Sequence, residues 1–162
     1  MRVAAGLVIL LVCTLWGCRR SILLKRRCAL ISGLRLLVEH YSIEIACTAP
    51  TLDELARLGQ GEFGELLRCC AEEEPDIRQA WNCAVTRLAE LPHCGSEEAE
   101  LMSELGRELG TCPAESQLSL LKLYAARLDM LYQQAEKISE QKGRLYRSGG
   151  VLAGLGAAVM LL

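Results

Sequence analysis

Two uncharged apolar stretches, residues 3–18 and 149–162, constrain the fold of this 162-residue chain most strongly. As continuous helices they would extend for roughly 24 Å and 21 Å, against about 30 Å for the hydrocarbon core of a bilayer. Trp16 suits the headgroup level, and Arg147 can direct its guanidinium back to the interface, so both helices can span a locally thinned bilayer. The predicted organisation is a transmembrane helix, a helical domain and a second transmembrane helix, over residues 1–18, 19–146 and 147–162.

Basic residues flank both stretches on the side of the central domain and predict the orientation of the chain. The residues expected to hold this orientation are Arg19, Arg20, Lys25, Arg26, Arg27 and Arg147. Because segments rich in lysine and arginine stay in the cytoplasm, the central domain is predicted to be cytoplasmic and both termini to lie outside. Residues 53–115 contain 15 acidic and 5 basic residues, an excess that the formal net charge of -2 conceals. Anionic lipid should therefore attract the flanks and repel the body.

A cleaved signal sequence is an alternative interpretation of the first stretch. Arg2 followed by an apolar run has the layout of a signal peptide, and residues 15–18 (LWGC) resemble a lipoprotein cleavage box that ends at Cys18. Trp16 is bulky where such boxes carry small residues, and basic residues follow at once, which favours an uncleaved anchor. Cleavage would make the chain a lipid-anchored or bitopic binding module instead.

The apolar residues between the two stretches recur with helical spacing, without the alternation of a strand. We predict an all-α fold of about six helices, in which two long antiparallel helices continue into the terminal spans and four short helices lie between them. One face of the first long helix carries Leu23, Leu30, Leu34, Leu37 and Tyr41. The last helix carries a heptad seam of Leu121, Tyr124, Leu128, Leu131, Ala135 and Ile138. Such a seam requires a partner helix, and the first long helix is the expected one.

Capping residues and helix breakers divide the segment between the long helices. Residues 51–54 supply a capping box for a short second helix, and glycines within residues 59–61 separate it from a third. The later boundaries are expected at Pro75 in the first turn of the fourth helix, Ser96 as N-cap of the fifth and Gly110 at its end. Inward positions of the short helices include Phe63, Cys70, Trp81, Leu88, Leu101 and Leu105.

No grouping of residues in the sequence points to catalysis or to a cofactor. The glycine-rich run GGVLAGLG lacks the lysine of a phosphate-binding loop and lies in a predicted membrane helix. His40 and His93 are isolated along the chain, and the nine cysteines include no C-x-x-C pair. We expect most cysteines to be small buried residues in a reducing cytosol. The acidic body and the 4% aromatic content argue against nucleic acid as a partner. The chain is therefore expected to be non-enzymatic, without metal or cofactor.

Two features predict contacts with other helices. Small residues form two adjacent stripes in the second apolar stretch, Gly149, Ala153 and Ala157 beside Gly150, Gly154 and Ala158. Such stripes allow close packing in a membrane, against the first span or against the same stretch in a homo-oligomer, and both alternatives stay open. Glu44 lies among apolar neighbours in SIEIA, so it is expected either to face water or to pair with a basic residue of a partner.

Short motifs follow one another along the whole chain. They comprise Glu44 and Ile45, Leu52, Ala80 and Trp81, Leu109, Gly110 and Gln117, and finally Arg147, Gly150 and Gly154. In this order they resemble the pattern of the stage III sporulation protein AB family of endospore-forming bacteria. The sequence departs from that pattern at APTL, where proline and threonine are exchanged, and at Pro113, which stands in place of an aspartate. The resemblance makes Gln117 a second candidate partner contact.

The resemblance implies a subunit of the channel that joins mother cell and forespore, placed in the mother-cell or outer forespore membrane. Members of the family are similar to the cytoplasmic domains of type II secretion platform proteins. They are thought to couple a cytosolic secretion-type ATPase, stage III sporulation protein AA, to other membrane subunits of the channel. We therefore expect a non-enzymatic adaptor whose partners are that ATPase, the other channel subunits and membrane lipid.

Overall fold

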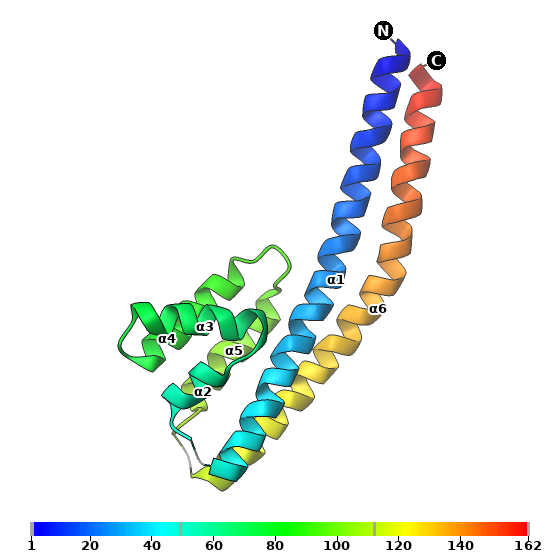
Figure 1. The fold of residues 1–162 in the computed structure, drawn as a ribbon. Helices are drawn as coiled ribbons and strands as arrows, with labels where there is room; N and C mark the ends of the chain where they lie inside the picture. The colour runs from blue at the N-terminus through cyan, green and yellow to red at the C-terminus, as the bar shows by residue number, and fades with distance from the viewer. Residues whose placement is uncertain (1, 49, 112, 162) are drawn as a thin grey trace. The chain divides into compact units, whose positions relative to one another are not determined.

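A computed structural model describes the backbone of residues 2–48, 50–111 and 113–161 (Figure 1). Side chains are described for residues 12, 15–48, 50–111, 113 and 115–142. The described residues form six helices and no strand, which confirms the predicted all-α class. The helices are α1 (Arg2–Thr48), α2 (Leu52–Leu58), α3 (Gly61–Glu73), α4 (Ile77–Ala89), α5 (Ser96–Glu108) and α6 (Ala114–Leu161).

The chain divides into two compact units. Unit 1 comprises residues 1–28 and 134–162, and unit 2 comprises residues 29–133. Each long helix therefore contributes one part to each unit, whereas α2 to α5 belong to unit 2 alone. The sequence-based boundaries after residues 18 and 146 stay predictions.

Within the residues that the structure describes, no helix combines the length and apolarity needed to cross a bilayer. The two predicted spans fall largely on residues 2–11, 13–14 and 143–162, whose side chains lie outside the described residues. The same holds for Arg147 and for the two small-residue stripes, Gly149, Gly150, Ala153, Gly154, Ala157 and Ala158. The spans and their packing therefore stay predictions.

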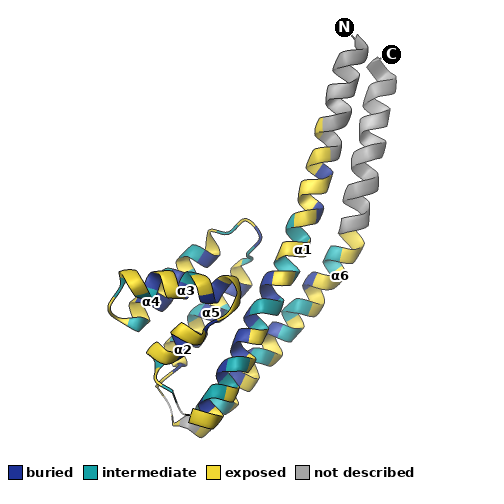
Figure 2. Cartoon of the chain, in the orientation of Figure 1, coloured by how far each residue is buried: buried dark blue, intermediate teal, exposed yellow. Residues whose placement is uncertain are grey.

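The long helices supply one half of the core of unit 2. The buried residues of this half include the predicted Leu30, Leu34, Leu37 and Tyr41 of α1, together with Ile31, Val38 and Ile45, and Leu121, Tyr124 and Leu128 of α6. Along α1 the buried positions alternate with less buried ones in a helical pattern, as expected for one face of a helix (Figure 2). Arg35 donates a hydrogen bond to Asp129 across the two helices at 2.7 Å. The predicted inward face and the predicted seam are thus confirmed in this unit, although Leu131 is only half-buried.

Trp81 of α4 is the centre of the short-helix half. Its indole Nε1 donates to the Met102 carbonyl at 2.8 Å, and its ring meets Phe63 edge-on at 5.2 Å between centroids. The α4 helix packs against both α3 and α5, so the tryptophan joins three helices. On α5 the predicted Leu105 is fully buried, as is Met102, whereas the predicted Leu101 is half-buried.

One of the predicted helix ends is confirmed. Thr51 and Glu54 form the predicted capping box, with Thr51 N donating to Glu54 Oε2 at 2.9 Å. The predicted C-cap of α5, Gly110, is wrong, because the helix ends at Glu108 with Leu109 as its C-cap, and Gly110 follows with φ +79°. Pro75 was predicted in the first turn of α4, but it lies before the helix. The N-cap of α4 is Asp76, whose carboxylate accepts a hydrogen bond from the Arg78 N–H. The N-cap of α5 is Gly95, and Ser96 already has helical geometry.

Candidate functional site

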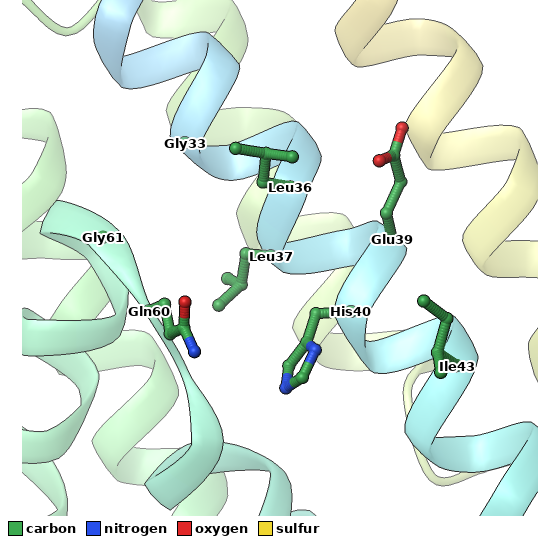
Figure 3. Close-up of a pocket in the computed structure, with 8 residues that line it drawn as sticks. All are labelled: Gly33, Leu36, Leu37, Glu39, His40, Ile43, Gln60 and Gly61. Atoms are coloured by element: carbon green, nitrogen blue, oxygen red, sulfur yellow. The ribbon is translucent and has the colours of Figure 1, made fainter.

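An open apolar groove lies between α1 and the segment that leads into α3 (Figure 3). We call it the α1 groove, and its volume is about 400 Å³. It is lined by Gly33, Leu36, Leu37, Glu39, His40 and Ile43 of α1 and by Gln60 and Gly61. Leu37, His40 and Gln60 extend into the space between the two segments, whereas Glu39 points away from Gln60 and forms part of the rim.

Leu36 and Ile43 are the apolar residues that the groove leaves uncovered. Each has 59% of its surface exposed, although the neighbouring Leu37 is buried. They are seven residues apart, so they lie on one face of α1 about 10.5 Å apart along its axis. A pair of large exposed aliphatic residues beside a groove is typical of a protein-binding surface.

Glycines shape the floor of the groove. Gly61 has φ +80°, a conformation that side chains disfavour, and a Cβ at this position would lie 3.9 Å from the Gly33 Cα. Gly33 differs, because a Cβ built on it meets no heavy atom within 4 Å. Glycine inside a helix costs about 1 kcal/mol relative to alanine. The packing of this chain therefore gives no reason for glycine at position 33.

Two local contacts between polar side chains lie at the groove. Arg35 contacts Glu39 at 3.3 Å besides its bond to Asp129, and His40 Nε2 lies 3.8 Å from Glu44 Oε1. Glu44, a predicted partner contact, is half-exposed and sits one helical turn beyond the groove-lining His40. Exposed pairs of this kind contribute little to stability, so the carboxylates can take other partners at small cost.

A second uncovered surface lies on α6. We call it the α6 face, and it comprises the exposed residues Lys122, Leu123, Ala126, Arg127 and Met130. Leu123 is 51% exposed and Met130 57%, again seven residues apart. Arg127 lies 3.4 Å from Glu104 and stands over the Tyr124 ring at 5.7 Å. The face is therefore apolar along its centre, with Lys122 and Arg127 at its sides and the carboxylates of Glu104 and Glu108 beside Arg127.

The other predicted site residues lie elsewhere. Gln117 is in the first turn of α6, where its backbone N–H donates to the Pro113 carbonyl at 3.0 Å, and it does not line the α1 groove. In unit 1, Arg27 is half-buried and the remaining described orientation residues are exposed, namely Arg19, Arg20, Lys25 and Arg26. Arg20 stands over the Trp16 ring at 5.8 Å from its centroid.

Among the buried polar groups of unit 2, His93 and Cys70 each contact one partner, whereas the Tyr41 hydroxyl has no hydrogen-bond partner among the described residues. His93, isolated in the sequence, is buried, and its Nε2 lies 3.1 Å from Glu62 Oε2, which ties the loop after α4 to α3. Burial, followed by a hydrogen bond to Cys83, raises the pKa of Cys70 to about 12. Among the side chains described, no three histidine, cysteine or acidic residues come together as metal ligands would.

The prediction that most cysteines are buried is wrong for the residues that the structure describes. Of the described cysteines only Cys70 is buried, and the exposed ones are Cys18, Cys47 and Cys69. The reason is that leucine and alanine already fill the inward faces of the helices, which leaves cysteine on outer positions. Cys13 and Cys112 lie outside the described side chains.

A family model for stage III sporulation protein AB matches residues 2–162. The chain belongs to the stage III sporulation protein AB family. Neither a curated protein nor a solved structure gives a significant match. The family assignment confirms the resemblance drawn from the order of motifs. It assigns the chain a role in stage III of sporulation. Two residues of those motifs, Trp81 and Gly110, lie at the centre of the short helices and just after α5.

Proposed function

We propose that this chain is a non-enzymatic, membrane-anchored adaptor that couples a cytosolic ATPase to the channel between mother cell and forespore. The observation that carries the proposal is the family match over residues 2–162. The partners we propose are stage III sporulation protein AA, the other membrane subunits of the channel and membrane lipid. The proposed location is the mother-cell or outer forespore membrane, with unit 2 in the cytoplasm and both termini outside.

Long uninterrupted helices support a mechanical role. The α1 helix runs from Arg2 to Thr48 and α6 from Ala114 to Leu161, each without a break. In unit 2 the two are held together by buried leucines and by the bond between Arg35 and Asp129. A force applied to unit 2 by a partner would therefore act on both helices at once. Transmission in this proposal occurs by helix packing, without a chemical step on this chain.

Exposed cations in unit 1 support the proposed orientation. Arg19, Arg20, Lys25 and Arg26 are exposed and free to meet anionic headgroups. The contact of Arg20 with the Trp16 ring pairs a cation with the aromatic residue that suits the membrane interface.

Recruitment of the ATPase to the membrane tests the coupling. In sporulating cells that contain the full chain, stage III sporulation protein AA is expected in the membrane fraction. In cells from which the chain has been deleted, the ATPase is expected in the soluble fraction. An ATPase that stays with the membrane after deletion would refute the adaptor role.

A charge in the second predicted span tests the anchoring. Gly154→Arg is expected to abolish heat-resistant spores, because a charged side chain at the bilayer centre is costly and blocks close helix packing. The matched control is Gly154→Ala, which keeps a small residue and should leave spore counts close to normal. Equal spore counts from the two variants would contradict the anchoring proposal.

A further inference from the structure

The α1 groove and the α6 face are uncovered surfaces of matching form. Leu36 and Ile43 project from one, Leu123 and Met130 from the other, and all four are more than half exposed. Both pairs have a seven-residue spacing, which corresponds to about 10.5 Å along a helix. Two helices with the same spacing of apolar residues can pack these residues against one another along a common seam.

The charges beside the two apolar pairs are opposite. Glu39 lines the α1 groove and Glu44 lies one helical turn beyond its His40, while the neighbouring Arg35 is engaged by Asp129. Lys122 and Arg127 lie on the α6 face, and Arg127 is paired there with Glu104 at 3.4 Å. Two α1 grooves brought together would oppose carboxylates, and two α6 faces would oppose their lysines, so both symmetric pairings are less favourable. For these charges the pairing of one surface with the other is the most favourable of the three.

The groove also has room for side chains of a helix from outside. It is open, with a volume of about 400 Å³, and the absent side chain at Gly33 leaves no atom within 4 Å of the position that a Cβ would take. A glycine that this chain does not need for its own packing is explained if a neighbouring helix approaches there. Met130 and Leu123 are unbranched at Cβ, so their side chains can adapt to such a groove.

We propose that copies of this chain associate head to tail, with the α6 face of one copy seated in the α1 groove of the next. Because the two surfaces differ, a pair of copies leaves one α1 groove and one α6 face free, and the association can continue into a ring or an open row. The proposal does not depend on coupling to an ATPase, since it concerns contacts between identical chains.

Photocrosslinking of the full chain in membranes tests the contact directly. A benzophenone amino acid replaces Leu36, and the chain is produced alone in a host without other sporulation proteins. We expect an adduct of two copies, with the crosslinked peptide from residues 122–130 of the second copy. An adduct between two α1 helices, an adduct with a host protein only, or uncrosslinked monomer only would each overturn the proposal.

Charge reversal separates specific pairing from general loss of structure. Reversing either the cations (Lys122→Glu with Arg127→Glu) or the acids (Glu39→Lys with Glu44→Lys) should lower the adduct yield by about fivefold or more. The four changes in one chain should restore most of the yield, because each copy then presents both reversed surfaces. A fourfold variant no better than either pair refutes the pairing. Reversals at the exposed Arg78 and Glu97, away from both surfaces, serve as the control and should leave the yield unchanged.

Mixing two blocked chains distinguishes head-to-tail from symmetric association. Gly33→Leu fills the groove, and Met130→Glu places a charge on the α6 face. In a head-to-tail arrangement each variant alone gives little adduct, whereas the mixture gives a dimer in which an intact groove holds an intact α6 face. A mixture that gives no more adduct than the separate variants would refute the arrangement.

Discussion

Gly106→Ala is expected to destabilise unit 2, although alanine is the better helix former. Gly106 lies on α5 against Trp81, and a Cβ built on it would overlap the indole atoms Cδ1 and Nε1. The indole would have to move. It would then lose its hydrogen bond to the Met102 carbonyl and its edge-on contact with Phe63.

The opposing contributions can be estimated from these contacts. Replacing glycine by alanine inside a helix gains about 1 kcal/mol. Overpacking costs about 1–3 kcal/mol, the hydrogen bond about 1 kcal/mol and the aromatic contact about 1 kcal/mol. Because these costs overlap, we expect a net loss of about 2 kcal/mol in the free energy of unfolding.

Gly33→Ala is the matched control. It makes the same substitution inside a helix, but at a position where the new Cβ meets no heavy atom within 4 Å. It should therefore raise the free energy of unfolding by about 0.5–1 kcal/mol. Opposite signs for the two variants are the expected result, since they share the propensity gain and differ only in the clash.

Urea unfolding of the full chain in detergent provides the measurement. Trp16→Phe leaves Trp81 as the single tryptophan, so its fluorescence reports the environment that the substitution disturbs. We expect a lower urea midpoint and a red-shifted emission for Gly106→Ala. A midpoint at or above the parent value, with unchanged emission, would refute the clash argument.

Three further outcomes are expected. Cys70 should react with iodoacetamide at pH 8 about tenfold or more slowly than the exposed Cys69, because burial raises the pKa of Cys70 to about 12. Peptide mass mapping measures the two reaction rates, and equal rates would contradict the burial of Cys70. Burial, with Glu108 nearby, raises the pKa of Tyr124 to about 12, so above about pH 9 the folded chain keeps a proton on Tyr124 that the unfolded chain releases. The free energy of unfolding should therefore fall between about pH 9 and 12. A urea midpoint that stays constant over this range would exclude the raised pKa. Because Leu36 is exposed, Leu36→Ala should change the free energy of unfolding by about 0.5 kcal/mol at most. Leu37 is buried, so Leu37→Ala should lower the free energy of unfolding by about 2–4 kcal/mol. Similar values for the two variants would contradict this difference in burial.

Local patterns explain what the sequence predicted correctly. The capping box at Thr51 and Glu54 depends on residues three apart, and the buried faces of α1 and α6 depend on spacing along one helix. Neither needs knowledge of the tertiary structure. The start of α4 was misplaced because Pro75 and Asp76 both favour a helix start, and only the geometry shows that the Asp76 carboxylate takes the cap.

The candidate site was largely missed because it depends on contacts between elements distant in sequence. Glu44 was singled out for its apolar neighbours, and it lies beside the α1 groove. The groove itself requires Gln60 and Gly61 to approach α1, which no periodicity indicates. Leu36 and Ile43 did carry a signal, since they fall outside the face defined by Leu37 and Tyr41. The sequence therefore contained a second apolar face, but not the groove beside it.

An α1 helix with two apolar faces needs two partners. Leu30, Leu34 and Leu37 are buried within unit 2, while Leu36 and Ile43 on another face are left exposed. A face that served stability alone would be covered inside the chain, because exposed leucine and isoleucine gain nothing from folding. The same reasoning applies to Leu123 and Met130 of α6, next to the buried Leu121 and Leu128. In the proposed association each long helix uses one face for the fold and the other for contact between copies, so assembly can be altered by substitutions that leave the fold intact.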